Sequence, residues 1–573
     1  MALPRETAGT HGLTVQDLRD VRTYVNSGAP YVWLTAAAIA TSVIIVVALL
    51  GLIAARGMPY FWPADVVVAE YREPGQEPVR VMAEIVDSEA VTVGRLKSAG
   101  LAVDEKQHFY DRLLLKVGNR DRYGADFRFL LGDWLVERIY PDPVMVLERM
   151  EWGNFYGVPV AAKQDGAIVG AGDAAFEAWQ PLQERANDLR AQIQKIEKGD
   201  IGRINYGLEQ LRLERRGLEL AGHTAQSNPE QYAELQQRQQ ELDGRYAGLQ
   251  DRLAQLYADI ARDALVLRTV EGEEVEIPLQ KIVRGYRPNV MGPVDKLGFY
   301  FAKLWEFVTE PPREANTEGG IAPAIFGTVL MVLIMSVIVT PFGVVAAVYL
   351  REYARQGLLT RIIRIAVNNL AGVPSIVFGM FGLGFFVYFV GAGIDRAFYA
   401  EALPAPTYGT PGILWASLTL ALLTLPVVIV ATEEGLARIP RSLREASLAL
   451  GATKVETLWR VVLPMASPAM MTGLILAVAR AAGEVAPLML VGVVKLAPSL
   501  PLDANVPFLH LDRKFMHLGF HIYDVGFQSP NVEAARPLVY ATALLLVAVI
   551  VLLNLAAIRI RNRLRERYKA LEH

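Results

Sequence analysis

Six long stretches of this sequence carry few or no charged residues, and each is long enough to cross a lipid bilayer as a helix. About 20 consecutive apolar residues match the hydrocarbon core of a membrane. The stretches lie at about 33–55, 322–348, 365–390, 411–431, 466–494 and 537–556. We therefore predict an α-helical membrane protein with six transmembrane helices. A purely soluble chain, a disordered chain and a collagen-like chain are excluded.

The first stretch contains 23 uncharged residues from Trp33 to Ala55. This length exceeds the apolar core of a cleavable signal peptide, which is about 7 to 15 residues. We expect the segment 31–56 to be a retained membrane anchor, and cleavage after Ala55 is the alternative.

Lysine and arginine residues indicate the orientation, because they gather in loops on the cytoplasmic side of a membrane. If all six spans cross the membrane, four basic segments lie on the same side of it. The loops 391–410 and 495–536 lie on the opposite side and contain fewer basic residues. The basic residues are Arg5, Arg19 and Arg22; Arg351, Arg355, Arg361 and Arg364; Arg438, Arg441, Arg444, Lys454 and Arg460; and Arg559, Arg561, Arg563, Arg565, Arg567 and Lys569. We predict a cytoplasmic tail 1–30, a basic cytoplasmic tail 559–573 and a region 57–315 on the outer side, which is the periplasm for a bacterial inner-membrane protein of a Gram-negative cell.

Composition excludes several kinds of chemistry. The 57 basic and 60 acidic residues give a net charge of −3, which does not favour nucleic acid as a partner. The chain has no cysteine, so disulfides, thiol nucleophiles and cysteine metal sites are excluded. The sequence also lacks the Gly-x4-Gly-Lys-Ser/Thr pattern that holds nucleotide phosphates. We expect a chain that is not an enzyme and does not itself hydrolyse ATP.

Two kinds of pattern divide the region 57–315. Short alternating runs punctuated by Pro, Gly, Asn and Asp predict a small β-domain over 57–170 and 264–290. Between these parts, apolar residues recur at heptad spacing from Leu182 to Ile196 and from Leu235 to Ile260. Gly222 suits the end of one helix, and Asn228 with Pro229 suits the start of the next. We predict an antiparallel coiled-coil hairpin over 173–263, acting as a spacer or docking arm, and an interfacial helix over 294–310.

The loop after the fourth span identifies a family. It contains Glu445-Ala446-Ser447, three residues, Gly451, nine residues, and Val461-Val462-Leu463-Pro464. This pattern resembles the signature loop of ABC importer permeases, Glu-Ala-Ala-x3-Gly-x9-Ile-x-Leu-Pro, with Ser447 and Val461 as mild departures. In that family the loop docks in a groove of the ATPase subunit. The resemblance therefore assigns ATPase coupling, within the loop 432–464, to Glu445, Ala446, Ser447, Gly451, Leu463 and Pro464.

The surrounding spans are similar to phosphate importer permeases of the PstA type. The similarity lies in Gly319–Thr328, in Leu370–Gly379 with its Gly-Val-Pro-Ser segment, and in Ala479–Leu488, where Val485 replaces a threonine. It covers 315–573 well and the first span loosely, but it does not cover 57–315. It implies the type I ABC importer permease fold, with a permease core of five helices over 316–558.

The resemblance also implies the partners. They are a second permease subunit (PstC type), two cytoplasmic ATPase copies (PstB type), a periplasmic phosphate-binding protein (PstS type) and a regulatory partner (PhoU type), besides membrane lipid. It implies no cofactor in this chain, with ATP and Mg bound by the ATPase subunits.

Charged and helix-breaking residues within the spans are candidates for the transport path. Arg480 and Glu484 interrupt the fifth span, and their spacing predicts a pair on one helix face. A guanidinium offers two parallel hydrogen bonds to a phosphate, so we assign the pair to the substrate path; a purely structural ion pair is the alternative. In the third span we assign Gly372, Pro374, Ser375 and Gly379 to a helix bend or to close packing. The histidines at 510, 517 and 521 favour a structural segment over a metal site.

We therefore predict the permease subunit of an ATP-driven phosphate importer. One alternative is an importer for another oxyanion or small polar solute, because the coupling loop is generic. The other is an envelope scaffold or adaptor that acts through the hairpin. Importers of this kind also report phosphate supply to signalling kinases. The sequence does not distinguish this regulatory role from transport.

Overall fold

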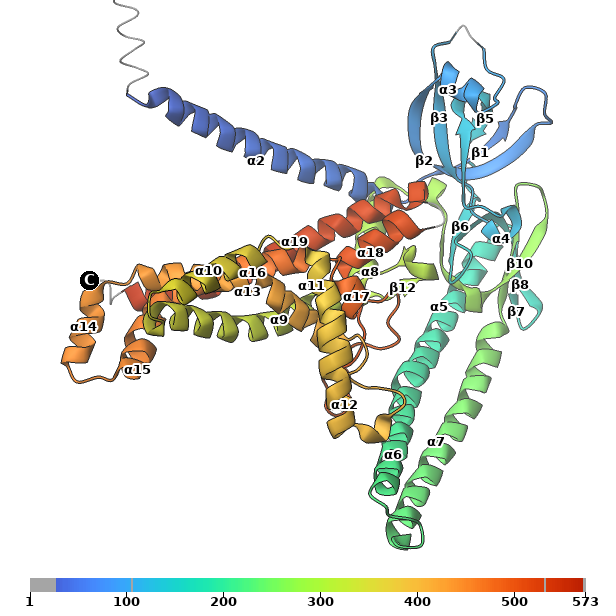
Figure 1. Ribbon diagram of the computed structural model, residues 1–573. Helices are drawn as coiled ribbons and strands as arrows, with labels where there is room; N and C mark the ends of the chain where they lie inside the picture. Colours follow the sequence, from blue (N-terminus) through green and yellow to red (C-terminus); the bar gives the residue numbers. More distant parts are fainter. Residues whose placement is uncertain (1–26, 105–106, 530–531, 570–573) are drawn as a thin grey trace, which may run out of the picture.

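The computed structural model describes residues 27–104, 107–529 and 532–569. A bundle of long helices, two β-sheets and a helical hairpin form its three parts (Figure 1). The arginines at 5, 19 and 22, and the last residues of the basic C-terminal tail, 570–573, lie outside the described residues.

The described residues contain six helices that are long and apolar enough to cross a membrane, as the sequence predicts. They run over Tyr31–Phe61, Ala322–Tyr353, Ser375–Phe398, Ile413–Ala437, Lys454–Gly483 and Ala535–Glu566. Their elements are α2 (Ala29–Gly57) with η1 (Met58–Phe61); α9 (Ala322–Val348) with η7 (Tyr349–Tyr353); α11 (Ser375–Phe381), η8 (Gly382–Gly391) and α12 (Ala392–Phe398); α13 (Ile413–Ala437); α15 (Lys454–Thr457), η10 (Leu458–Val462) and α16 (Leu463–Gly483); and α19 (Val532–Lys569). Because α19 continues to Lys569, much of the segment predicted as a tail after 558 is helical.

The third span begins later than the sequence predicts. A separate helix, α10 (Leu358–Leu370), precedes it, and the chain then turns before α11 starts at Ser375. Pro374 takes the N-cap position of α11 with an extended ψ of 135°. Because a proline disfavours the helical conformation of the residue before it, one continuous helix does not form here. The predicted boundary at 365 is therefore wrong.

The fifth span is shifted in the opposite direction, to 454–483 instead of 466–494. It starts early because Thr453 and Glu456 form a capping box at the start of α15. It ends at Gly483, and Glu484 has an extended backbone with ψ of 126°. A short helix, α17 (Leu488–Val491), follows the break. The prediction that Arg480 and Glu484 share one continuous helix is therefore wrong.

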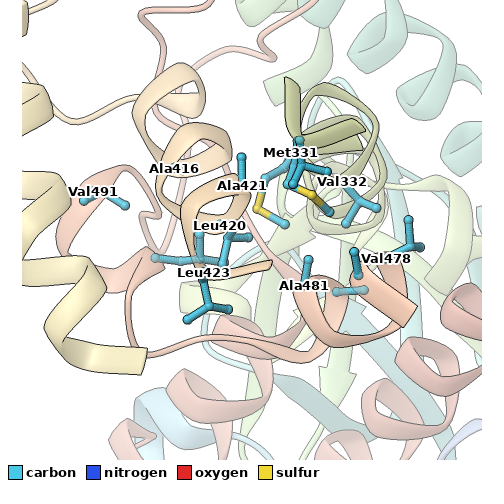
Figure 2. Packing of buried hydrophobic residues seen from close by; sticks show 14 of the residues in the cluster. Met331, Val332, Ala416, Leu420, Ala421, Leu423, Val478, Ala481 and Val491 are labelled. Atoms are coloured by element: carbon cyan, nitrogen blue, oxygen red, sulfur yellow. The ribbon is translucent and has the colours of Figure 1, made fainter. Parts of the chain in front are cut away.

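The bundle is built around α13, which packs between α9 and α16 (Figure 2). Figure 2 shows Met331 and Val332 of α9, Leu420 and Ala421 of α13, and Ala481 of α16 converging on one apolar core. Small residues allow the helices to approach closely: a Cβ on Gly343 would lie 2.5 Å from Val428 Cγ1. In contrast, α2 is exposed along its length and reaches the bundle only near its end, where Gly57 packs on Ala541.

Two antiparallel sheets form the β-domain. The order of the first is β4-β3-β2-β1-β5, and that of the second is β10-β9-β7-β6-β11, with β8 paired to β7. The strands are β1 (Val66–Tyr71), β2 (Val79–Thr92), β3 (Phe109–Lys116), β4 (Phe127–Leu131), β5 (Leu135–Ile139), β6 (Met145–Arg149), β7 (Asn154–Gln164), β8 (Ala167–Ala171), β9 (Ala264–Arg268), β10 (Glu274–Pro278) and β11 (Ile282–Tyr286). Short helices connect strands of these sheets: α3 (Val93–Ser98), α4 (Arg120–Tyr123), η2 (Gly132–Trp134) and η4 (Leu279–Lys281). A fifth short helix, η5 (Pro288–Val290), follows β11.

The hairpin is inserted between β8 and β9. Its first arm consists of α5 (Ala174–Gln194), the π-helical turn η3 (Lys195–Ile201) and α6 (Gly202–Leu220), and its second arm is α7 (Pro229–Ala261). Gly222 ends the first arm with φ of +80°, and Pro229 opens the second. Leu256 and Ile260 of the heptad seam are buried near the sheets, whereas Leu235 and Leu242 are half-buried towards the tip. The two arms of the hairpin therefore pack against each other along a narrow apolar seam, as in a two-helix coiled coil.

Short segments join the β-domain and the hairpin to the bundle. Helix α8 (Pro293–Thr309), η6 (Glu314–Asn316) and the pair β12 (Pro312–Arg313) and β13 (Glu318–Gly319) lie between the sheets and α9. Beside the hairpin, η9 (Ala400–Ala402) contacts α6, and Tyr206 donates a hydrogen bond to the Val506 carbonyl. The remaining elements are α14 (Arg441–Ala449), α18 (Leu518–Tyr523) and η11 (Asp524–Gln528).

Candidate functional site: the coupling loop and the break in the fifth span

The coupling loop folds into two short helices joined by a tight turn. Helix α14 ends at Ala449, and Gly451 takes a left-handed conformation with φ of +88°. The Gly451 amide donates to the Leu448 carbonyl at 3.0 Å, and the Ala452 amide donates to the Ser447 carbonyl at 3.2 Å. This pair of bonds is a Schellman motif, which requires a residue that tolerates positive φ. Gly451 therefore ends α14, as its place in the signature predicts.

A hydroxyl pair and a capping box fix the angle between the two helices. Ser447 Oγ lies 2.9 Å from Thr457 Oγ1, which joins α14 to α15. At the start of α15, the Thr453 amide donates to Glu456 Oε2 at 2.9 Å, and the Glu456 amide donates to Thr453 Oγ1 at 3.2 Å. Ser447 therefore makes a contact that the alanine of the usual signature cannot make.

Ion pairs and hydrogen bonds attach the loop to the end of the second span. Arg444 Nη2 lies 2.9 Å from Glu352 Oε1, and both side chains are mostly buried, at 19% and 13% exposed. Arg444 also donates to the Ile439 and Leu436 carbonyls, at 2.7 and 2.9 Å. Lys454 Nζ donates to the Glu352 carbonyl at 2.6 Å. These contacts fasten α14 and α15 to η7, the continuation of α9.

Several large apolar side chains are exposed on the outer surface of the loop, among charged ones. Leu450 is 90% exposed and Trp459 is 70% exposed, and Leu448 and Val455 are also exposed. Glu445 and Ala446 lie exposed on α14, whereas Leu463 and Pro464 are half-buried at the start of α16. Clusters of exposed apolar side chains mark sites of protein–protein contact.

Arg480 and Glu484 meet at the break in the fifth span. Arg480 is in the last turn of α16, and its Nε lies 3.6 Å from Glu484 Oε1, just past the end of the helix. The side chains are 32% and 23% exposed, whereas Ala481 and Ala482 behind them are buried in the core of the bundle. The ion pair therefore lies at a surface of the bundle and not inside it. Charges within a membrane protein face a polar path or a protein partner, since lipid does not solvate them.

The four residues assigned to the third span have different surroundings. A Cβ on Gly379 would lie 2.7 Å from Pro487 Cα, so this glycine allows the third span to touch the break that follows Glu484. Pro374 and Ser375 begin α11. A Cβ on Gly372 would meet only the Asn369 carbonyl, at 3.5 Å, so close packing does not require a glycine there.

Each of the three histidine side chains makes its own polar contact. His510 Nε2 is 3.0 Å from Asp503 Oδ1, His517 Nδ1 accepts a hydrogen bond from the Gly519 amide, and His521 Nδ1 is 3.5 Å from Thr542 Oγ1. In the part of the chain that the structure describes, no group of three or more His, Cys, Asp or Glu side chains is arranged to hold a metal ion.

Sequence reasoning missed the acidic partners of the basic loops. Arg364 Nη2 lies 2.6 Å from Glu433 Oε1 beside a cavity of about 260 Å³ between α10 and α13. Glu352 likewise lies at the end of a span. The sequence does show carboxylates at the ends of the apolar stretches, and these could have indicated ion pairs. It does not show which arginine pairs with each carboxylate.

Residues 339–569 match the family model of the binding-protein-dependent transport system inner membrane component. With six apolar helices, this match defines the chain as a multi-pass inner-membrane permease subunit of an ABC transporter, which is not itself an enzyme. The phosphate transport system permease protein PstA 1 of Mycobacterium tuberculosis (strain CDC 1551 / Oshkosh) is 36% identical over 251 residues, or 42% of this chain and 71% of that protein. PstA of Yersinia pestis is 38% identical over 186 residues, covering 32% of this chain and 56% of that protein. The chain belongs to the PstA family of phosphate transport system permeases.

A solved inward-facing MetNI methionine ABC transporter aligns with 42% of this chain and 95% of its own at 20% identity. The TM-score is 0.32, and a score at this level does not by itself assign a fold.

Proposed function

We propose that this chain forms one half of the membrane path of an ATP-driven inorganic phosphate importer. A second permease subunit forms the other half, two ATPase copies bind below, and a periplasmic binding protein delivers the anion. The observation that carries the proposal is the Arg480–Glu484 pair at the break in the fifth span, in a chain whose relatives are named phosphate permeases.

The chemistry of the pair suits an anion that must bind and then leave. The guanidinium of Arg480 offers two parallel hydrogen bonds to phosphate oxygens. Glu484 holds the guanidinium when the path is empty and competes with the anion when it is bound, since both carry negative charge. Both side chains are partly exposed at the surface of the bundle, which leaves them accessible to a path shared with the second permease subunit.

The coupling loop supports a route from ATP to this path. An ATPase subunit contacts the exposed surface of α14 and the apolar side chains near it, including Leu450. Its closure displaces α14, and the Arg444–Glu352 and Lys454–Glu352 contacts carry the displacement into α9. The Gly379–Pro487 contact links the third span to the break beside Glu484. These links support an alternating-access cycle in which ATP binding moves the spans around the anion.

This cycle requires a defined topology. We propose that both termini and the coupling loop lie in the cytoplasm, with 57–315 in the periplasm. The exposed arginines at the ends of α9, α13 and α19 support this orientation, because basic residues remain on the cytoplasmic side.

Phosphate uptake by the complex reconstituted in liposomes tests the proposal. Arg480→Ala should lower ATP-dependent phosphate uptake at least about tenfold, the effect of losing one charge-assisted interaction of about 1.4 kcal/mol. Arg245→Ala on the hairpin is the matched control, since this arginine is 67% exposed and pairs with Glu241 in the same helix. Full phosphate uptake by Arg480→Ala would exclude Arg480 as the anion contact.

A further inference from the structure

Helix α8 carries an apolar stripe that is exposed rather than packed on the protein. Val294, Leu297, Phe301 and Trp305 follow one another at spacings of three and four residues, so they share one face of the helix. Their exposed fractions are 82%, 49%, 58% and 70%. A helix on the surface of a soluble domain has the opposite arrangement, in which the apolar face packs on the core and the polar face meets water. An exposed apolar stripe of this kind marks a surface that contacts another molecule or a membrane.

The charged face of α8 is turned towards the β-domain. Three of the four charged residues of the helix form ion pairs with that domain. The pairs are Lys296 with Asp65 at 2.5 Å, Lys303 with Glu148 at 2.5 Å, and Glu306 with Arg284 at 2.8 Å. The fourth charged residue, Asp295, accepts a hydrogen bond from the Gly292 amide at 3.1 Å and so caps the first turn. These contacts fix the polar face against the protein, and the apolar stripe therefore faces outward.

The C-terminal half of α8 adjoins the ends of two membrane spans. Phe61, the last residue of the first span, packs on Phe307 with their ring centroids 5.1 Å apart. The Ile321 amide donates to the Phe307 carbonyl at 2.8 Å, and the amide of Ala322, where the second span begins, donates to the Glu310 carbonyl at 3.1 Å. Figure 1 shows α8 between the sheets and the long helices. The helix is therefore attached to the points where two apolar spans end.

We propose that α8 lies in the surface of the bilayer, with its apolar stripe inserted among the lipid chains just below the headgroups. The apolar surface of the first span, exposed at Leu49 and Leu52, leads through Phe61 to α8, and this continuity favours lipid as the occupant. Trp305 suits this depth, because tryptophan is enriched where a membrane meets water. The sequence predicts an interfacial helix over 294–310, and the proposal adds the face that meets lipid and the force that holds it there.

The driving force is the burial of apolar surface, not attraction to anionic lipid. Many interfacial helices use free lysines to bind anionic headgroups. In α8, Lys296 and Lys303 already pair with Asp65 and Glu148. Because the same ion pairs join α8 to the β-domain, an inserted helix holds that domain at the bilayer surface.

Fluorescence quenching tests this placement, and it requires no transport. The chain contains no cysteine, so one introduced cysteine can carry an environment-sensitive fluorophore. The test variants are Phe301→Cys and Trp305→Cys, each in the full-length chain purified with its partner subunits and placed in phosphatidylcholine nanodiscs. Glu271→Cys, at an exposed position of the β-domain, is the control. Lipids with a nitroxide near the headgroup end of the acyl chain should quench both test variants at least about twofold more than lipids with a nitroxide near the chain end, and should not quench the control.

Three results would overturn the proposal. Quenching by aqueous iodide without quenching by lipid would show that the stripe lies in water. Protection from both quenchers would show that a protein, such as the second permease subunit, covers it. Quenching that appears only when phosphatidylglycerol is added would contradict insertion by apolar burial, since added anionic lipid or salt should change the signal less than about twofold.

A measurement on the unmodified complex covers the case in which the labelled variants do not fold. A photoactivated carbene reagent dissolved in the lipid phase should modify the segment 294–305 and leave the β-domain loop 269–273 unmodified, as mapped by mass spectrometry. An unmodified segment 294–305, in a complex whose spans are modified, would refute the placement of α8 in the bilayer surface.

Discussion

Replacing Arg444 with alanine should uncouple ATP hydrolysis from transport. The side chain holds Glu352 at 2.9 Å and donates to the Ile439 and Leu436 carbonyls, so its loss detaches α14 from the end of α9. Breaking a fully buried ion pair costs about 3–5 kcal/mol. Since Arg444 and Glu352 are 19% and 13% exposed, we expect a smaller loss of about 2 kcal/mol for the docked position of the loop.

A loss of about 2 kcal/mol lowers the ratio of docked to undocked loop about 30-fold. The assay is the number of phosphate ions transported per ATP hydrolysed by the reconstituted complex. This ratio should fall at least tenfold in Arg444→Ala, while hydrolysis continues and the subunits still co-purify. Arg441→Ala is the matched control, because Arg441 is an exposed arginine on the same helix. An unchanged ratio in Arg444→Ala would refute the transmission of motion through this contact.

Three further outcomes follow from other contacts. Gly379→Ala places a Cβ 2.7 Å from Pro487 Cα, so it should lower uptake and reduce stability by about 1–3 kcal/mol in thermal unfolding, whereas Gly384→Ala, which meets open space, should do neither. Burial lowers the pKa of His517 and His521 to about 4, so the folded protein keeps both histidines neutral while the unfolded chain takes up protons below about pH 6.5. Thermal stability should therefore fall as the pH decreases from 6.5 to 4, and an identical slope in a folded His517→Asn/His521→Asn variant would contradict this reasoning. Tyr206→Phe removes the hydrogen bond to the Val506 carbonyl, so hydrogen exchange in the loop 501–513 should become several-fold faster; unchanged exchange would mean that the hairpin does not hold this loop.

Local patterns in the sequence predicted the number of spans and the turn at Gly451. The ends of the spans were harder, because apolar composition continues through Pro374 and past Gly483 while the helix does not. The extended backbone at Glu484 is one example. Arg480 and Glu484 form an ion pair, but Glu484 lies past the end of the helix that contains Arg480.

Contacts between distant residues could not be predicted. Arg444 meets a glutamate that lies 92 residues earlier in the chain. A cavity of about 110 Å³ beside α8 combines Glu84, Lys303 and Glu318 from three separate segments. No local spacing encodes such partners, since they are brought together by the packing of whole elements.

The central claim is that the complex containing this chain imports phosphate through the path beside Arg480, and competition uptake tests it most directly. Labelled phosphate should enter liposomes only when ATP and the binding protein are both present. Excess unlabelled phosphate should abolish this uptake, whereas excess sulfate or molybdate should not. Uptake of sulfate or molybdate without uptake of phosphate would contradict the account.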